Sequence, residues 1–434
     1  MFSFPPNFLW GAATAAQQVE GQNFNNDWWD WEQVPGHIHG GDSSRVACDW
    51  WNGRYREDFD RAQSLGHNAH RLSVEWSRIE PSEGKWEDAV IARYREMLIA
   101  LRERNIEPFV TLVHYTHPRW FMARGGWLSD ESPRLMERYA AHMVETLGDL
   151  CHFWMTLNEP NLYMVLNYVW KGRPPGTGSI TQAVHVARNM MLAHYRAYAA
   201  VHHAQSGAQV SLAHQWRWIS PANPQSLLDR AVAWQSNYLT NEMFLRTLTD
   251  GKMPFPLGRG EKIGDGKMPL DYFAINYYFE NRVAFDVTRP GSLFARQLPS
   301  TWLDGTPYAS FDEAGNLNPS ALYELLKRLA RFQLPIYITE SGTFEIGYDN
   351  QSPYLIAHLE ALHRAQQDGA DVRGYFWWTL TDNFEWDQGY WLRFGLYHLD
   401  VESQARTKRP VADVYARIIR ENGVADELVE QFRG

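Results

Sequence analysis

The sequence contains only two cysteines in 434 residues, Cys48 and Cys151. A small secreted protein that depends on disulfides usually carries several pairs, so we expect these two thiols to be reduced and buried. The first residues also lack a basic segment followed by a long apolar one, so no signal peptide is visible in them. Together these absences predict a cytoplasmic protein.

Long apolar runs and an excess of basic residues are also missing. No uninterrupted apolar stretch approaches the length that spans a membrane. The chain has 41 Lys and Arg against 51 Asp and Glu, a net charge of −10. This balance argues against nucleic acid or an anionic membrane as a partner and leaves a small molecule as the expected one. No linker-like or low-complexity segment divides the chain, so we predict one catalytic domain over residues 1–434.

Segments typical of strands alternate with segments typical of helices along the whole chain. Eight strand candidates are found, at residues 8–11, 68–73, 109–114, 153–159, 209–215, 272–278, 334–340 and 374–378. Such alternation implies a parallel sheet with crossover helices, and eight repeats fit a closed (β/α)8 TIM barrel of the α/β class. Its extended βα loops should form a pocket at the C-terminal face. Residues 280–317 show little pattern and are expected to be an insertion.

Two of these strands end in a glutamate. Glu340 ends the apolar strand that begins near Pro335, and Glu159 ends another aromatic and apolar strand just before Pro160. An isolated acid in this place could simply cap the helix that follows. Two of them on parallel strands of one barrel can face each other, and a facing pair of carboxyl groups is what glycoside hydrolysis needs.

Polar and aromatic residues end the other strands too. The residues at this rim are Gln17, Gln18, Arg71, His114, Asn158, Asn276, Tyr278 and Trp378. Arg71 could hold Glu340 in its ionised form, and Tyr278 could donate a hydrogen bond to it. Burial beside aromatic rings and the nearby charge of Glu340 should instead keep Glu159 protonated.

Aromatic residues are abundant, with 20 Trp and 21 Tyr, and they are interleaved with acids and amides over residues 374–386. Trp378 and Trp386 could pack in the core like most tryptophans. They could also stack on the apolar faces of sugar rings while a neighbouring carboxylate accepts hydrogen bonds from sugar hydroxyl groups.

Several motifs resemble those of glycoside hydrolase family 1, the β-glucosidase and β-galactosidase family. They are Thr156-Leu157-Asn158-Glu159-Pro160, Ile338-Thr339-Glu340-Ser341-Gly342 and Asp382-Asn383-Phe384-Glu385-Trp386. Residues 8–14, 18–21 and 71–79 resemble the N-terminal and second-strand motifs, and the match continues to Arg409 and Pro410. The resemblance therefore covers essentially the whole chain.

The resemblance implies a role for each matching residue. Glu340 would be the nucleophile and Glu159 the acid/base, with Arg71 and Tyr278 supporting the nucleophile. The sugar-binding residues would be Gln18, His114, Tyr115, Asn158, Asn276, Tyr278, Trp378, Glu385, Trp386 and Phe394. The family needs no metal or organic cofactor, and none is expected here, because the histidine pairs of this chain lack a clear third ligand.

Some positions depart from the family pattern. Ser341 replaces a usual Asn, Gln17 and Tyr115 replace an aromatic Tyr and Trp, and Asn161 and Asn316 replace tryptophans. The phosphosugar branch has Ser, Lys and Tyr at the positions of Glu385, Leu392 and Phe394. A phosphate would here meet a carboxylate without a compensating cation, so we predict unphosphorylated sugars.

We therefore expect a retaining exo-β-glycosidase that acts on short β-glucosides, with galactosides and fucosides as plausible substrates, through a covalent glycosyl-enzyme. One alternative is a transglycosylase that uses the same chemistry. Another is a non-catalytic sugar-binding barrel, which the presence of both Glu159 and Glu340 disfavours. The sequence leaves the preferred sugar, the leaving group and the oligomeric state open.

Overall fold

The computed structural model describes residues 2–299, 317–345, 347 and 349–432. Eight parallel strands close into a barrel in the order β11-β12-β2-β3-β4-β5-β6-β8. They are β2 (Leu9–Ala13), β3 (Ala69–Ser73), β4 (Glu107–Val113), β5 (Phe153–Asn158), β6 (Gln209–Gln215), β8 (Phe273–Asn276), β11 (Ile336–Ser341) and β12 (Val372–Trp378). The predicted TIM barrel is confirmed, with each strand close to its predicted position.

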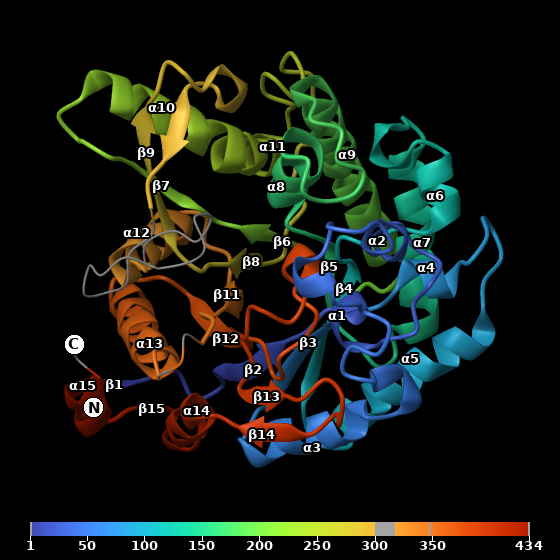
Figure 1. Cartoon of the computed structure of the whole chain (residues 1–434), viewed down its shortest axis with the longest axis vertical. Coiled ribbons are helices and arrows are strands. Elements are labelled where there is room, and N and C mark those ends of the chain that lie inside the picture. Colours follow the sequence, from blue (N-terminus) through green and yellow to red (C-terminus); the bar gives the residue numbers. More distant parts are fainter. Residues whose placement is uncertain (1, 300–316, 346, 348, 433–434) are drawn as a thin grey trace.

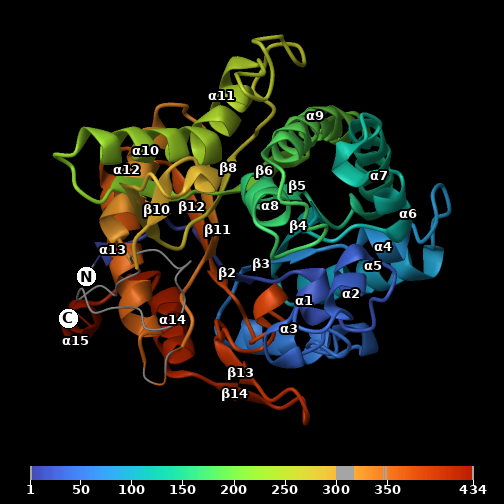
Figure 2. The same ribbon diagram turned by 45° about the horizontal axis from the view of Figure 1, so that its top comes forward.

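Helices surround the barrel (Figures 1 and 2). The main ones are α3 (Tyr55–Ser64), α5 (Asp88–Arg102), α7 (Ser132–Leu147), α9 (Ile180–Ala204), α11 (Met243–Asp250), α12 (Pro319–Ala330), α13 (Gln351–Gln367) and α14 (Pro410–Glu421). Local chemistry explains the start of α12, where the Asn318 side chain accepts a hydrogen bond from the Ala321 N–H at 3.2 Å and Pro319 follows in the first turn. Buried leucines on one face then attach this helix to the barrel.

Shorter elements connect and close this frame. The helical ones are α1 (Ala16–Val19), α2 (Asp27–Glu32), α4 (Trp76–Ile79), α6 (Arg119–Ala123), α8 (Pro160–Tyr163), η4 (Met164–Val169) and α15 (Asp426–Phe432). The strands β1 (Phe2–Ser3) and β15 (Gly423–Val424) pair with each other, so the beginning of the chain lies beside its end (Figure 1). The strands β13 (Tyr397–Leu399) and β14 (Arg406–Lys408) form a second antiparallel pair.

The barrel interior is a packed core of its own. Small residues such as Ala13, Ala69 and Ala213 pack there with large ones such as Phe109 and Phe376, all of them buried. Together they fill the interior without leaving a pore. Side chains one layer further along the strands are thereby held at the C-terminal face, where the polar strand ends lie.

The segment between β6 and α12 is more ordered than the sequence indicated. Strands β7 (Trp218–Pro221), β9 (Glu280–Phe285) and β10 (Ala295–Gln297) form a small sheet in the order β10-β9-β7, and α10 (Leu227–Asn237) packs on it. The prediction of a patternless insertion from residue 280 is therefore wrong for its first part. In β9 the exposed Arg282 lies between two pairs of buried residues, so the strand lacks the usual alternation of buried and exposed residues. Residues 300–316, including Asn316, lie outside the described residues.

Both cysteines are free and fully buried, as predicted. Within the described part of the chain, no helix is both long enough and apolar enough to cross a bilayer.

Candidate active site

A cavity of about 110 Å³ opens at the C-terminal ends of the barrel strands. Ten residues that the sequence placed in a site line it together: His114, Tyr115, Asn158, Glu159, Tyr278, Glu340, Trp378, Glu385, Trp386 and Phe394. Gln18, Arg71 and Asn276 are not among its lining residues. They lie directly behind it and touch the residues that do line it.

Glu340, at the end of β11, is almost completely buried. Its Oε1 contacts the guanidinium of Arg71 in a very short ion pair, and the hydroxyl group of Tyr278 donates to Oε2 at 2.6 Å. Burial raises the pKa of Glu340 to about 7, Arg71 lowers the pKa and the charge of Glu159 raises it further. The expected supports of Glu340 are thus both in place, although burial outweighs them.

Glu159 follows β5 directly and is equally enclosed, with 4% of its surface exposed. Its Oε1 accepts a hydrogen bond from Nδ2 of Asn276 at 2.8 Å. Its Oε2 accepts a very short one from the hydroxyl group of Tyr115. The sequence placed Tyr115 only among the sugar contacts, so this bond to the carboxyl group was missed.

A single amide lies between the two carboxyl groups. Besides its bond to Glu159, Asn276 accepts hydrogen bonds through Oδ1 from Thr339 at 2.8 Å and from Arg71 at 3.4 Å. Because Arg71 also holds Glu340, one short chain of contacts joins the two glutamates. The two glutamates therefore occupy the same opening and accept hydrogen bonds from different donors.

Arg71 is the centre of this network and is fully buried. Its Nη2 donates to Oδ1 of Asn158 at 2.7 Å, and its Nε donates to Oγ1 of Thr111 at 3.0 Å. A buried guanidinium group is tolerated only when its donors are satisfied. Arg71 therefore fixes the positions of several strand ends at once.

Glu385 lies at another side of the same cavity. Gln18 donates to its Oε2 at 3.0 Å. Removal from solvent raises the pKa of Glu385 to about 8, although the nearby cation Arg173 acts in the opposite direction. Arg173 is itself paired with Asp387 at 2.8 Å. The sequence-based argument that no cation lies near Glu385 is therefore wrong, because Arg173 comes from the distant segment after η4.

The His114 ring lines the cavity, and two polar atoms of the site lack partners in the described part of the chain. Nε2 of His114 lies 3.1 Å from Nδ2 of Asn158. Burial lowers the pKa of His114, so its ring is neutral at physiological pH. Within the described residues, Nδ1 of His114 and Oε1 of Gln18 have no hydrogen-bond partner. The indole rings of Trp378 and Trp386 lie nearly parallel to the His114 ring, 6.1 and 6.0 Å from its centre.

Comparison with known proteins agrees with this geometry. Residues 2–424 match the model of glycosyl hydrolase family 1. The chain belongs to this family. It is 34% identical over 461 residues to the bifunctional β-D-glucosidase/β-D-fucosidase of Bifidobacterium breve, covering 96% of this chain and 98% of that one. It is 29% identical to a 1,4-β-D-glucan glucohydrolase of Thermotoga neapolitana, covering 98% and 100%.

Solved structures of family 1 enzymes superpose on nearly the full chain. The β-glycosidase from Pyrococcus horikoshii has a TM-score of 0.87 and 34% identity, covering 99% of this chain and 98% of that one. The family 1 β-glucosidase from Thermotoga maritima has a TM-score of 0.89 and 28% identity, covering 98% and 100%. The chain is thus a glycoside hydrolase, as the motifs indicated.

The departures from the family 1 pattern are accommodated locally. Asn161 is buried, and its Nδ2 donates to the carbonyl groups of Gln215 at 2.7 Å and Thr240 at 3.0 Å. Ser341 lies 3.0 Å from the hydroxyl group of Tyr354. Gln17 donates to Ser44 at 2.9 Å and does not line the cavity.

Seven lining residues were missed by the motif analysis: Leu162, Leu166, Arg173, Gln215, Arg217, Phe279 and Gln388. Gln215 ends β6, so the same strand-end rule could have found it. Arg173 lies in a Gly- and Pro-rich stretch that follows no strand, and no pattern marks it. No group of three or more His, Cys, Asp or Glu side chains within the described residues could hold a metal ion.

Proposed function

We propose that this family 1 enzyme is a retaining exo-β-glycosidase that releases terminal, unphosphorylated β-D-glucosyl groups and also accepts galactosyl and fucosyl groups. The observation that carries the proposal is the buried pair Glu159 and Glu340, on one cavity but with different hydrogen-bond partners. Two carboxyl groups in different environments can act as proton donor and nucleophile.

In the first step Glu340 is the nucleophile and Glu159 the acid. The carboxylate oxygen of Glu340 forms a bond to the anomeric carbon while the glycosidic C–O bond breaks. The leaving oxygen takes the proton from Glu159. Arg71 and Tyr278 hold Glu340 in place and favour its ionised form, which is the form that attacks.

In the second step Glu159 acts as a base. It removes a proton from water, the water oxygen bonds to the anomeric carbon, and the bond to Glu340 breaks. The two inversions give net retention. Asn276 donates to Glu159, and Arg71 donates to Asn158, so both groups that face the sugar are positioned by residues behind the cavity.

The cavity suits one terminal sugar. Its volume of about 110 Å³ is small, and aromatic side chains line it, which suits a terminal sugar. Glu385, Gln18 and His114 provide hydroxyl partners, and Asn158 is placed to bind the 2-hydroxyl group. Trp378 and Trp386 supply ring faces. Buried polar groups of this kind discriminate strongly between substrates that satisfy them and those that do not.

Unphosphorylated substrates fit this site best. The cation Arg173 is already paired with Asp387, and Arg217 donates through Nε to Gln215 at 2.9 Å. The neutral Leu392 lines the position where a phosphate-binding cation would be expected. We also infer that residues 1–434 work as one catalytic domain in the cytoplasm, because buried free thiols suit a reducing compartment.

A panel of 4-nitrophenyl β-glycosides that differ only in the sugar tests the proposal. We expect turnover of the glucoside with release of β-glucose as first product, and weaker or equal turnover of the galactoside and fucoside. Tight sugar binding without turnover would favour the non-catalytic barrel. Oligosaccharide products at high sugar concentration, in place of free glucose, would favour the transglycosylase.

A further inference from the structure

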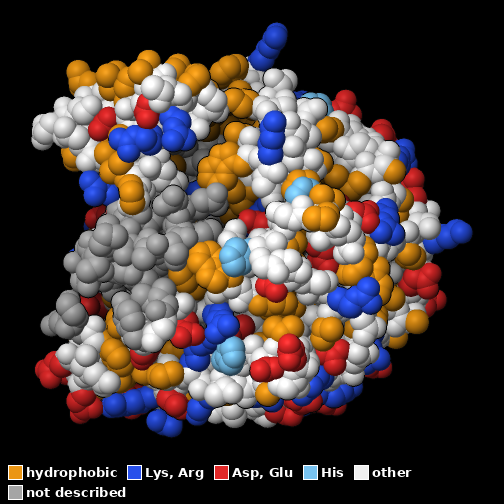
Figure 3. Space-filling model, in the orientation of Figure 1, with side chains coloured by type: hydrophobic (Ala, Val, Ile, Leu, Met, Phe, Trp, Pro, Cys, Tyr) orange, Lys and Arg blue, Asp and Glu red, His pale blue; other side chains and the backbone are white. Residues whose placement is uncertain are grey.

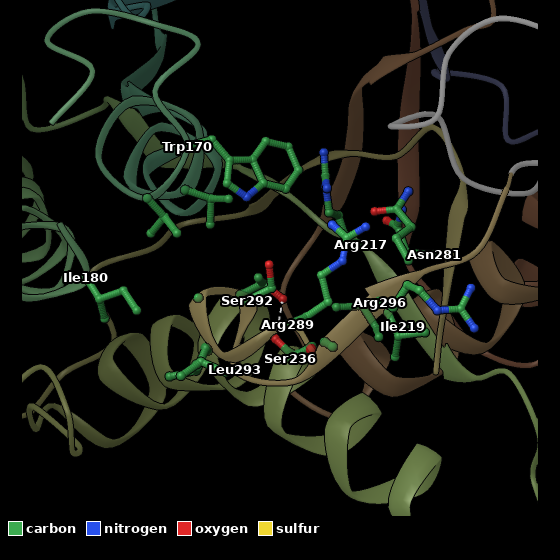
Figure 4. Close-up of a pocket in the computed structure, with 18 of the residues that line it drawn as sticks. Trp170, Ile180, Arg217, Ile219, Ser236, Asn281, Arg289, Ser292, Leu293 and Arg296 are labelled. Carbon is green, nitrogen blue, oxygen red and sulfur yellow. Dashed lines mark hydrogen bonds between the residues drawn. The ribbon is translucent and has the colours of Figure 1, made fainter. Parts of the chain in front are cut away.

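A second and larger cavity of about 600 Å³ lies beside the sugar site. Arg217, which follows β6, lines both cavities. The other walls come from η4, α9, α10 and the small sheet of β7, β9 and β10. Figure 4 shows Trp170 and Ile180 on one side of this cavity and Arg217, Asn281 and Arg296 on the other.

The second cavity lies on the side of the sugar site from which the leaving group departs. The helical segment α8–η4 begins directly after Glu159, the proposed proton donor to the leaving oxygen. Leu162 and Leu166 of this segment line the sugar site, whereas Met164 and Val165 line the second cavity. A substituent on the leaving oxygen that continues past Glu159 therefore meets this cavity.

Most of the described lining is apolar. The charged side chains among the described lining residues are all basic, namely Arg217, Arg289 and Arg296. Asp286 pairs with Arg296 at 3.4 Å and also interacts electrostatically with Arg289, so it partly neutralises both cations. Arg217 donates through Nε to Oε1 of Gln215 at 2.9 Å. In Figure 3, basic side chains lie among hydrophobic ones over the region of α10 and β9. This local charge is opposite to the net charge of −10 of the whole chain.

One buried side chain in the wall has no protein partner. Asn281 of β9 is 3% exposed, and neither Nδ2 nor Oδ1 forms a hydrogen bond within the described residues. Such a buried amide costs free energy unless something satisfies it. A ligand atom in the cavity would do so.

We propose that this cavity binds the leaving group of the natural substrate, and that this leaving group is an extended apolar molecule with a carboxylate. Its apolar body packs on residues such as Trp170 and Val283. The carboxylate accepts hydrogen bonds from Arg217 and from Nδ2 of Asn281, while Arg289 and Arg296 add positive charge at the exposed edge. The proposal rests on the proposed glycosidase function and names its substrate class.

Two matched glucosides test the charge. One is the 4-glucoside of 6-(4-hydroxyphenyl)hexanoic acid, and the other is the same glucoside with the acid replaced by a primary amide. We expect kcat/KM to be about tenfold higher for the acid, mainly through KM, because a charge-assisted hydrogen bond is stronger than a neutral one. High salt should reduce this ratio.

Variants of the cavity wall then test where the carboxylate binds. Arg289→Gln and Asn281→Leu should each lower the acid-to-amide ratio several-fold. Since both substrates are measured on the same preparation, a partly unfolded variant does not alter the ratio. Arg420→Gln makes the same charge change on α14, far from the cavity (Figure 1), and should keep the wild-type ratio.

Equal kcat/KM for the acid and the amide, or a preference for the amide, would reject the anionic leaving group. A wild-type ratio in both cavity variants would reject this cavity as its site. Either result leaves hydrolysis of 4-nitrophenyl β-D-glucoside, and with it the proposed function, intact. Failure to turn over that small substrate would instead overturn the glycosidase function on which the proposal rests.

Discussion

The hydroxyl group of Tyr115 donates a hydrogen bond to Oε2 of Glu159. The two residues follow the neighbouring strands β4 and β5, and both have left-handed backbone conformations, with φ of 69° and 47°. Non-glycine residues rarely adopt this conformation, and such strain is often found at functional sites. The backbone thus orients both partners of this bond. The Trp that is usual in the family at the position of Tyr115 has no hydroxyl group and could not form it.

Tyr115→Phe should slow substrates with poor leaving groups more than activated ones. Without the hydroxyl group, Glu159 is held less firmly where it donates its proton. We expect kcat for an alkyl β-glucoside to fall about tenfold, the size of one hydrogen bond to a charged group. The rate for a 2,4-dinitrophenyl glucoside should change little. Tyr415→Phe, which removes another buried hydroxyl group, is the control and should affect both substrates alike; if Tyr115→Phe does the same, its bond has no catalytic role.

Glu340→Ala should lower kcat by about 10⁴-fold or more, because no group remains to form the covalent intermediate. Added azide should restore turnover of an activated aryl β-glucoside and give the α-glucosyl azide, which NMR identifies. A β-configured azide product would show that another residue is the nucleophile.

Glu159→Gln should remove general acid catalysis while leaving the nucleophile in place. We expect losses of about 10²–10⁴-fold on alkyl glucosides and much smaller effects on the glycosylation step of dinitrophenyl glucosides. Pre-steady-state kinetics separates that step from hydrolysis of the intermediate. Equal losses for both leaving groups in glycosylation would contradict the acid role.

The acid limb of the pH profile should report Glu340. Burial raises its pKa to about 7, so the ionised, attacking form becomes scarce as the pH falls through neutrality, and kcat/KM should fall with it. Arg71 lowers this pKa, so Arg71→Met should move the acid limb to higher pH. Arg71→Lys keeps the positive charge and should move it less. Identical acid limbs in all three proteins would show that Arg71 does not act through its charge.

Asp382 should matter for stability more than for chemistry. It is 4% exposed and accepts hydrogen bonds from Arg409 at 2.8 Å and His398 at 3.1 Å. Burial alone would raise its pKa, but these partners lower it below the usual value of about 4. The stabilisation is therefore complete above about pH 4 and is lost as the pH falls through the folded-state pKa.

Asp382→Asn should accordingly reduce the free energy of unfolding by about 3 kcal/mol at pH 7, because the buried Arg409 loses its closer carboxylate partner and keeps the pair with Glu345 at 3.2 Å. Urea denaturation at pH 7 and at pH 3 should show a smaller difference from the wild type at the lower pH. Asp413→Asn breaks the exposed pair with Lys408 and should cost less than about 1 kcal/mol. A loss at pH 3 as large as at pH 7 would contradict the role of the Asp382 charge.

The barrel and its rim could be predicted because they follow from repeated local patterns. Several of the strands end in polar residues, so the strand ends that hold Arg71, Asn158 and Glu340 are visible in the sequence. Closure of the barrel then brings them together. The contact between Tyr115 and Glu159 could not be predicted, because it depends on the backbone angles after each strand.

Contributions from long loops were the least predictable. Arg173 reaches Asp387 across 214 positions of sequence, and neither residue belongs to a repeating pattern. The small sheet around β9 was missed because short strands with exposed charged residues lack a clear alternation. Such features depend on tertiary packing, which overrides weak local preferences.

Arg71 reaches from β3 to Thr111, Asn158, Asn276 and Glu340 on four other strands. Randomising these strand ends to obtain new sugar preferences would therefore disturb all of these contacts at once, because they share one guanidinium group. Most of the resulting variants would be inactive. Diversity introduced instead into the walls around Trp170 and Asn281, which Arg71 does not touch, leaves the reacting groups undisturbed and changes what is released.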